Sequence, residues 1–358
     1  MATSAAPTST FRGNGPTRRT CSPPRRVSNG SRWWSRRTAK TVLVTGIDGF
    51  AGSHLSDLLM RRRHTVHGTI RQAQPAPRAE LAAGVLTHQV DLLDRDRVST
   101  LVREIQPQWV FHLAALSSPA ASWDDPATTI ATNAGLEANL LAALVKQKPM
   151  ARVVVIGSAD EYGRPVGGVR RLDEATPLRP LTPYGVSKVT QDLLALQYHL
   201  SHGLAAIRMR PFNHAGPRQA PQFALASFAQ QIARIELGKQ APIMKVGNLE
   251  ARRDFTDVRD IVRGYVLAAE KGKPGEVYNI GSGTAPRLRE LVALLLKMTR
   301  APITLEVDPE RKHPVEAEVY VCDARRFQRL TGWRPRIALE RMLRDTLDDW
   351  RRHERSVA

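Results

Sequence analysis

Two hydrophobic periods alternate along the chain from residue 41 onward. Short apolar, β-branched runs predict strands, and segments with apolar residues three and four positions apart predict helices. The predicted strands are Val42–Thr45, Thr65–Ile70, Gly84–Val90, Trp109–Leu113, Arg152–Ile156 and Ala205–Met209. The predicted helices between them span 51–62, 97–105, 128–145 and 184–202. Continuously apolar strands that alternate with helices predict an α/β fold, a Rossmann-type doubly wound parallel sheet covered on both faces.

The pattern loosens after about residue 211. Strand-like runs remain at Ile243–Val246 and Val277–Ile280, and helical patterns at 227–237, 258–270, 287–298 and 338–350. We therefore expect a Rossmann domain whose main part is 41–210. Residues 211–358 are expected to form mainly a smaller C-terminal α/β lobe, with some segments returning to the first domain. Ligands bind at the carboxyl edge of such sheets, so the lobe should close over that edge.

A glycine-rich turn follows the first predicted strand. Gly46, Gly49 and Gly52 are spaced three apart and lead directly into a helical pattern. A strand that enters a glycine turn and a helix N-terminus forms a cradle for a pyrophosphate. The spacing differs from the usual G-x-G-x-x-G, so the motif alone is weak. The cofactor-binding residues predicted here are Gly46, Ile47, Asp48, Gly49, Phe50 and Gly52.

The end of the second strand indicates which dinucleotide binds. Sites that prefer NAD place an acid about 20 residues past the glycines, where it holds the ribose hydroxyls. This chain has Arg71 there and no acid before Glu80, which favours NADPH, with NADH still possible. The alternative is that Arg71 is an ordinary solvated loop residue. The other expected cofactor contacts are Asp91, Leu92, Leu113, Ala114, Ala115 and Phe212.

A tyrosine and a lysine lie one helical turn apart at Tyr184 and Lys188, and Ser158 follows an apolar strand. An ammonium about 4 Å from a phenol, at an effective dielectric near 20, stabilises the phenolate by about 4 kcal/mol. We therefore expect Lys188 to lower the Tyr184 pKa from about 10 toward 7. The Ser158 hydroxyl would bind the oxygen on which charge develops. These groups predict a carbonyl–alcohol redox site.

Taken in this order, the glycines, the serine and the Tyr–Lys pair resemble the extended short-chain dehydrogenase/reductases that act on nucleotide sugars. The segments 157–163 (GSADEYG), 211–217 (PFNHAGP) and 246–255 (VGNLEARRDF) resemble the GDP-hexose branch, and within it the GDP-6-deoxy-D-mannose reductases. The resemblance covers roughly 41–350. It implies that Ser158, Tyr184 and Lys188 are catalytic, the last two also contacting the cofactor. The substrate-binding residues that it implies are Ser117, Asp160, Asn213, Arg218, Lys245, Arg253 and Glu316.

The resemblance implies a reaction and an assembly. The C4 ketone of GDP-4-keto-6-deoxy-D-mannose would be reduced to GDP-D-rhamnose, with Tyr184 as proton donor and no metal. The GDP-linked keto-deoxyhexose would be the partner, and the protein a homodimer. The residues leave the C4 stereochemistry open. Three departures from the family pattern affect the substrate site: Arg218 stands at a glycine position, His313 replaces an arginine, and Ala159-Asp160 replaces Ser-Glu.

Two other functions remain open from the sequence. The GDP-mannose 4,6-dehydratases share the fold and the triad, but they use a glutamate where this chain has the shorter Asp160. Their loop after Asn213 also contains a Glu-Ser-Pro element, which is absent here. A non-catalytic nucleotide- or RNA-binding member of the superfamily is a remote alternative. The presence of both Tyr184 and Lys188 argues against it.

Composition changes this interpretation little. The net charge is +19, but nine of the basic residues lie in 1–40, a segment rich in Ser, Pro and Arg and free of acids. We expect 1–40 to be a disordered basic extension; a transit peptide or an upstream mis-assigned start are alternatives. The remaining positive charge suits polyanionic ligands, and neither nucleic acid nor membrane is an expected partner. Two cysteines and no apolar run long enough to span a bilayer favour the cytoplasm.

Overall fold

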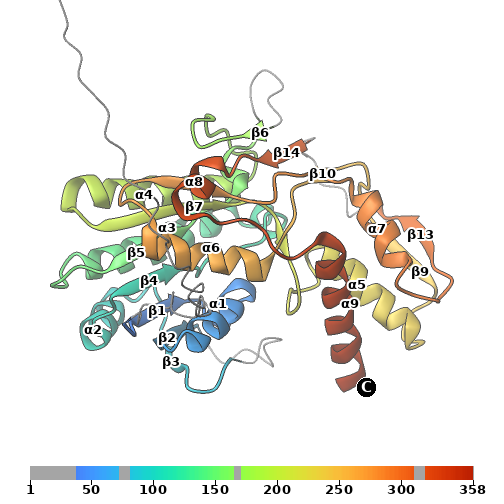
Figure 1. The fold of residues 1–358 in the computed structure, drawn as a ribbon, viewed down its shortest axis with the longest axis horizontal. Helices are drawn as coiled ribbons and strands as arrows, with labels where there is room; N and C mark the ends of the chain where they lie inside the picture. Colours follow the sequence, from blue (N-terminus) through green and yellow to red (C-terminus); the bar gives the residue numbers. More distant parts are fainter. Residues whose placement is uncertain (1–37, 72–80, 165–170, 310–318, 358) are drawn as a thin grey trace, which may run out of the picture. The chain divides into compact units, whose positions relative to one another are not determined.

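The computed structural model describes residues 38–71, 81–164, 171–309 and 319–357. Ala39–Ala358 forms one compact unit. Figure 1 follows the described part from β1 to the C-terminal helix α9. The expected basic extension, 1–40, lies outside the described residues except for its last three positions. No helix in the described ranges is long and apolar enough to cross a membrane.

A seven-stranded sheet forms the centre of the described unit, with the order β12-β7-β5-β4-β1-β2-β3. Every neighbouring pair of strands is parallel. The strands are β1 (Thr41–Thr45), β2 (Thr65–Ile70), β3 (Leu86–Gln89), β4 (Trp109–His112), β5 (Arg152–Ile156), β7 (Ala205–Pro211) and β12 (Val277–Ile280). From β1 the strand order continues outward through β2 to β3, and from β4 it continues outward on the other side through β5 and β7 to β12. The boundary between β1 and β4 is therefore the switch point, where such sheets bind ligands. The predicted Rossmann-type parallel sheet is confirmed.

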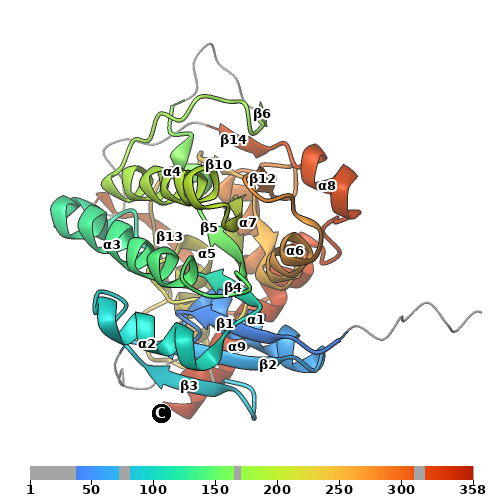
Figure 2. The same cartoon turned by 90° about the vertical axis from the view of Figure 1, so that its left-hand side faces the viewer.

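Helices cover both faces of this sheet, as Figure 2 shows with α3 and α4 on one side and α6 on the other. One face packs on α1 (Phe50–Arg61) and α6 (Val258–Lys271). The other packs on α2 (Arg95–Ile105), α3 (Pro126–Leu144) and α4 (Pro183–His202). Because side chains alternate along a strand, Val42 and Val44 enter the first core and Leu43 the second. This explains why the strands are apolar at consecutive positions.

The C-terminal part supplies a third hydrophobic core. It lies between the helices α5 (Ala224–Glu236), α7 (Leu288–Leu296) and α9 (Leu339–Ser356) and the strand β9 (Ile243–Val246). The exposed strand β13 (Thr304–Val307) pairs with β9 in parallel. Figure 1 shows these elements grouped together on one side of the unit. In contrast, β12 and α6 belong to the central sheet and its covering helices. Segments after residue 211 therefore serve both the sheet and the third core.

Several short elements have no counterpart in the sequence prediction. They are β6 (Arg171–Leu172), β8 (His214–Ala215), β10 (Arg252–Arg253), β11 (Thr256–Asp257), β14 (Val319–Cys322), α8 (Arg325–Thr331) and the 3₁₀ turns η1 (Ala121–Trp123) and η2 (Ala159–Glu161). A strand of two residues is too short to show a period, so only tertiary pairing defines it. The predicted third strand is also shorter than expected, because pairing with β2 covers only Leu86–Gln89.

Candidate active site

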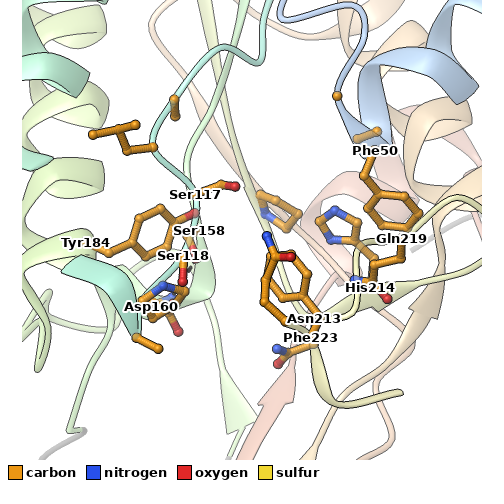
Figure 3. Close-up of a pocket in the computed structure, with 18 of the residues that line it drawn as sticks. Phe50, Ser117, Ser118, Ser158, Asp160, Tyr184, Asn213, His214, Gln219 and Phe223 are labelled. Atoms are coloured by element: carbon orange, nitrogen blue, oxygen red, sulfur yellow. Dashed lines mark hydrogen bonds between the residues drawn. The ribbon is translucent and has the colours of Figure 1, made fainter. Parts of the chain in front are cut away.

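A cavity of about 1050 Å³ opens at the carboxyl edge of the central sheet. Its walls come from the glycine turn, from the ends of β2, β4, β5 and β7, and from the C-terminal lobe at Phe228, Leu249 and Leu288. Figure 3 shows Ser117, Ser158, Asp160 and Tyr184 on one wall, facing Phe50 and His214 on the other. A cavity of this size at a sheet switch point is large enough for a dinucleotide next to a second ligand.

The glycines are required by the shape of the turn. Gly46 has φ +65°, and a Cβ there would lie 3.0 Å from the Ala114 Cα. A Cβ on Gly52 would lie only 2.3 Å from the Gly46 carbonyl oxygen. The Thr45 hydroxyl accepts hydrogen bonds from the amides of Leu113 (3.1 Å) and Ala114 (3.2 Å), which joins the ends of β1 and β4. The two loops that would hold a dinucleotide therefore form one closely packed edge.

Most of the predicted cofactor residues line this cavity. They are Gly46, Asp48, Gly49, Phe50, Gly52, Arg71, Asp91, Leu92, Leu113, Ala114, Ala115, Tyr184, Lys188 and Phe212. The exception is Ile47, which is fully buried in the core. Its side chain occupies the space that a Cβ on Gly68 would need. The turn can still hold a phosphate, since glycine loops bind through backbone amides.

The three predicted catalytic residues are brought together at the cavity wall. Ser158 follows β5 and caps η2: its hydroxyl accepts from the Asp160 amide (3.1 Å), and its own amide donates to Glu161 (2.7 Å). Tyr184 lies in the first turn of α4, whose N-cap Thr182 accepts from the Gly185 amide (2.9 Å). Lys188 follows one turn later. Hydrogen bonds at the start of η2 therefore fix the position of Ser158, and the N-cap of α4 fixes the position of Tyr184.

The charge state of Tyr184 differs from the one expected. Burial raises the pKa of the phenol, the Asp160 carboxylate raises it further, and a hydrogen bond with the Ser158 side chain partly offsets both effects. The Lys188 ammonium nitrogen lies 5.9 Å from the centre of the tyrosine ring. The expectation that Lys188 would bring this pKa toward 7 is therefore wrong for the protein as described. Tyr184 keeps its proton at neutral pH.

Lys188 is itself almost fully buried. Its ammonium donates to the Ile156 carbonyl oxygen (2.8 Å) and to the Gln191 amide oxygen (2.8 Å). Burial lowers the Lys188 pKa to about 8, although the carboxylates of Glu137 and Glu161 raise it. Two neutral acceptors therefore fix the position of the Lys188 ammonium. With a pKa of about 8, Lys188 titrates close to physiological pH.

The predicted substrate residues divide into three groups. Ser117, Asp160, Asn213 and Arg253 line the cavity. Burial raises the Asp160 pKa, and the positive charge of Arg253 lowers it, so these two residues act on each other across the cavity. The structure does not bring Arg218 or Lys245 to the cavity, and Glu316 lies outside the described residues.

Arg218 and Lys245 have other contacts. The Arg218 guanidinium pairs with Asp57 of α1 (2.9 Å), and its amide donates to Asp349 of α9 (2.8 Å). The Lys245 side chain is exposed on β9, and its backbone bonds to Gln231 of α5 (2.8 Å). Both residues therefore hold elements together next to the site instead of facing into it.

Sequence reasoning assigned no role to several residues of the cavity wall. These residues are Ser118, Thr182, His214, Gln219, Gln222, Phe223, Asn248 and Asp308. The His214 ring stacks on Phe50, with 5.8 Å between the ring centres and a 6° tilt, so the loop after β7 contacts the glycine turn. Its position next to Asn213 was the available signal. Asn248 and Asp308 come from lobe loops that have no periodic pattern.

Comparison with known proteins places this fold and site in a family. The family model of GDP-mannose 4,6 dehydratase matches residues 43–346. The chain belongs to this family. The GDP-6-deoxy-D-mannose reductase of Pseudomonas aeruginosa is 34% identical over 309 residues, 86% of this chain and 96% of that protein. The GDP-mannose 4,6-dehydratase of Yersinia enterocolitica is 28% identical, covering 85% of this chain and 91% of its own length.

Solved structures of related enzymes have the same fold. The structure titled RMD from Pseudomonas aeruginosa complexed with NADPH has a TM-score of 0.75 at 33% identity, covering 88% of this chain and 100% of that one. The UDP-glucose 4-epimerase of Thermotoga maritima, solved with UDP-glucose, has a TM-score of 0.79 at 27% identity, covering 87% and 99%. The resemblance to nucleotide-sugar short-chain dehydrogenase/reductases is thus confirmed.

Proposed function

We propose that the protein is an NADPH-dependent reductase that converts the C4 ketone of GDP-4-keto-6-deoxy-D-mannose to the alcohol of GDP-D-rhamnose. The observation that supports this most is that Ser158, Tyr184 and Lys188 lie together in the wall of a cavity at the switch point of the sheet, with the Tyr184 phenol hydrogen-bonded with Ser158. Reduction of a ketone needs a hydride and a proton donor, and this phenol is a donor already in its acid form. The greater similarity to a GDP-6-deoxy-D-mannose reductase than to the dehydratases agrees with this assignment.

The residues of this chain fit the cofactor. The glycine turn would hold the pyrophosphate, and Arg71, in the cavity wall at the end of β2, would meet a 2′-phosphate. No described residue from Thr65 to Arg71 is an acid that would repel that phosphate. NADPH, when bound, supplies the hydride for C4. NADH remains compatible with the turn itself.

Each catalytic side chain has a separate task in this reaction. Tyr184 donates its proton to the C4 oxygen as negative charge develops there. The Ser158 hydroxyl donates a hydrogen bond to the same oxygen, stabilising the charge before the proton arrives. The Lys188 ammonium favours the phenolate that remains after the transfer, because it is a buried positive charge one helical turn away.

The substrate would lie along the wall that holds Asn213, Asp160 and Arg253. A guanidinium fork suits a diphosphate, so we assign Arg253 to the diphosphate of the substrate. Asn213 and Ser117 would contact the sugar, and Glu316 the guanosine ribose. Arg218 and Lys245 are no longer assigned to the substrate, because their side chains do not face the cavity.

The dehydratase is the second candidate. Dehydration of GDP-mannose requires removal of the C5 proton as well as hydride transfer, so it needs a base next to the tyrosine. Asp160 occupies that position, and burial raises its pKa, although the positive charge of Arg253 opposes this shift. Its side chain is one methylene shorter than the glutamate of the dehydratases, which favours simple reduction.

Product analysis separates the two candidates. We expect the protein with the keto-sugar and NADPH to give GDP-D-rhamnose, and the protein with GDP-mannose alone to give no keto-sugar. Formation of keto-sugar from GDP-mannose would replace the reductase assignment with the dehydratase. The C4 epimer, GDP-6-deoxy-D-talose, would leave the reaction type unchanged and correct its stereochemistry.

The role of Tyr184 has a matched control on its own helix. Tyr184→Phe should lower kcat by at least about 10²-fold, the smaller effect usual for loss of an acid catalyst, with the NADPH dissociation constant retained. Tyr198→Phe removes a phenol from α4 outside the cavity and should leave kcat unchanged. Normal turnover by Tyr184→Phe would contradict the proposed function.

We further propose that the protein is a homodimer that pairs through α4, works in the cytoplasm and has no nucleic-acid partner. Val186, Leu193 and Leu200 recur every seven residues on this helix, and their side chains are 39%, 52% and 74% exposed. Residues at this spacing form one stripe, which a two-fold partner would cover with the same stripe. Large apolar side chains aligned on a helix face are typical of an interface.

A further inference from the structure

A buried polar cluster lies behind the catalytic residues, where α3 packs on α4. The Asn133 side chain donates to the Ser187 hydroxyl (2.9 Å), and the Gln191 amide donates to the Asn133 carbonyl oxygen (3.0 Å). Gln191 also accepts from the Lys188 ammonium (2.8 Å). Glu137 lies one turn after Asn133 on α3, and its side chain is fully buried. Lys188 is the one residue of this cluster to which a role in the active site has been assigned above.

Glu137 is exceptional within this cluster. No described residue donates a hydrogen bond of ordinary geometry to either of its carboxylate oxygens, although the Gln191 side chain faces it. A carboxyl group removed from water is costly unless a charge or hydrogen bonds compensate. Burial raises the Glu137 pKa well above its usual value. The charges that act on this carboxyl group are those of Lys188, Asp192 and Glu161, of which only Lys188 is positive and opposes the shift.

The other acids near Lys188 already have partners. Glu161 of η2 pairs with Arg210 of β7 (2.8 Å). Asp192 of α4 pairs with both Arg210 (2.8 Å) and Arg208 (2.8 Å). Among the described residues, Glu137 is therefore the acid near Lys188 that has no arginine partner. Lys188 in turn donates only to neutral acceptors, so its ammonium has no other unshared counter-charge.

We propose that Glu137 is a positioning residue for the reduction: its carboxylate keeps Lys188 in the ammonium form behind Tyr184. The catalytic part of this inference rests on the proposed function. The electrostatic link between Glu137 and Lys188 does not rest on the proposed function, because it depends only on how α3 packs on α4. The two groups lie in the same buried cluster, and the charge of each favours the ionised form of the other.

The direction of the effect follows from the surroundings. Burial lowers the Lys188 pKa to about 8, and Glu137 raises it more than Glu161 does. His112 of β4 adds no positive charge near pH 7, since burial and Lys188 lower its pKa to about 3. Removing the Glu137 carboxylate must therefore lower the Lys188 pKa. Lys188 would then lose its charge at a lower pH, and activity that needs the ammonium would be lost as pH rises through that lower value.

The titration of Lys188 can be measured directly, without substrate or cofactor. In protein labelled with ¹³Cε-lysine, the Lys188 resonance is assigned by its absence in Lys188→Met and followed against pH. Glu137→Gln should lower the midpoint by about 1 pH unit or more, the usual effect of losing a nearby opposite charge. Glu137→Asp should restore most of the shift. Glu104→Gln, which removes an exposed acid on α2, should leave the midpoint unchanged.

A pH profile of the enzyme gives the second readout. The alkaline limb of kcat should move to lower pH in Glu137→Gln, with the KM for the keto-sugar nearly unchanged. An unchanged Lys188 midpoint in Glu137→Gln overturns the inference, even when wild type reduces the ketone. If the Lys188 midpoint shifts in Glu137→Gln but the wild type reduces no ketone, the proposed function is overturned and the electrostatic link between Glu137 and Lys188 is retained.

A reciprocal measurement applies if Glu137→Gln does not fold. In protein labelled with ¹³Cδ-glutamate, the Glu137 resonance is assigned with Glu137→Asp. Lys188→Met should raise the titration midpoint of Glu137, because Lys188 is the positive charge that lowers it. An unchanged Glu137 midpoint would overturn the inference by this route.

Discussion

Burial, more than the nearest charge, sets the protonation of the residues at this site. Tyr184 is 8% exposed and Lys188 4%, and burial is the largest cause of the pKa change at each. The same cause acts in opposite directions: the phenol keeps its proton more firmly, and the ammonium releases its proton more easily. This combination suits a reductase, which starts each turnover with a protonated donor.

Arg71 is the residue that we propose to determine the choice of cofactor. Its side chain is exposed and borders the cavity at the end of β2. A charge-assisted contact with a 2′-phosphate is worth about 1.5–3 kcal/mol, or roughly ten- to a hundredfold in affinity. Arg71→Ala should therefore raise the KM for NADPH by that factor and leave the KM for NADH nearly unchanged. Arg97→Ala, an exposed arginine on α2 outside the cavity, is the control. Equal changes in both constants would show that Arg71 does not read the phosphate.

Among the elements, the β1–α1 unit depends most on close packing. Gly52 lies in the first turn of α1, where a Cβ would lie 2.3 Å from the Gly46 carbonyl oxygen and 2.9 Å from the Ile47 Cα. Both are backbone atoms, which cannot move as a side chain can. Gly52→Ala should destabilise the protein by about 1–3 kcal/mol, as overpacking does, and should weaken NADPH binding by distorting the turn. Urea unfolding and a cofactor titration measure the two effects.

Gly135 offers a matched control on another helix. It also lies inside a helix, α3, but a Cβ there would meet only the flexible Leu93 side chain at 3.0 Å. Gly135→Ala should be neutral or stabilising by up to about 1 kcal/mol, because alanine has the higher helix propensity. Equal destabilisation by both substitutions would mean that the β1–α1 turn has no special packing requirement.

The loop after β7 links three elements. Arg218 has φ +71°, a left-handed conformation usually taken by glycine, and glycine is the residue expected there. Its guanidinium pairs with Asp57 of α1, and its backbone amide binds Asp349 of α9. These contacts explain why an arginine is retained in a strained conformation: it fastens the loop between the sheet and the lobe.

For the whole molecule, the proposed homodimer would form through the exposed stripe of α4. Leu193→Asp combined with Leu200→Asp places two carboxylates at the centre of the proposed two-fold contact, where they would repel their copies. We expect this variant to be monomeric by analytical ultracentrifugation at concentrations at which wild type is dimeric. The outward-facing positions are exposed, so the thermal midpoint of the monomer should change little. Leu305→Asp, an exposed leucine on β13, should leave the assembly intact. A wild-type monomer would contradict the proposal.

The sequence by itself determined the central sheet and pointed to the candidate catalytic residues that the structure brings together at one cavity. Strands such as Arg152–Ile156 are apolar at consecutive positions because two cores bury them, and this signal is local. The glycines of the turn and the Tyr–Lys pair on one helix are likewise local patterns, each with a fixed spacing. Ser158 could be placed because the end of a buried parallel strand fixes where the next residue lies.

Only the tertiary structure decided how distant segments act on one another. The contacts of Arg218 with Asp57 and Asp349 join residues far apart in the sequence, so no periodic pattern records them. The two-residue strands and the cavity residues Asn248 and Asp308 depend on the folded lobe in the same way. The protonation of Tyr184 was predicted in the wrong direction for a related reason. A pKa depends on how many atoms from the whole chain exclude water, and the spacing of two residues on one helix does not contain that information.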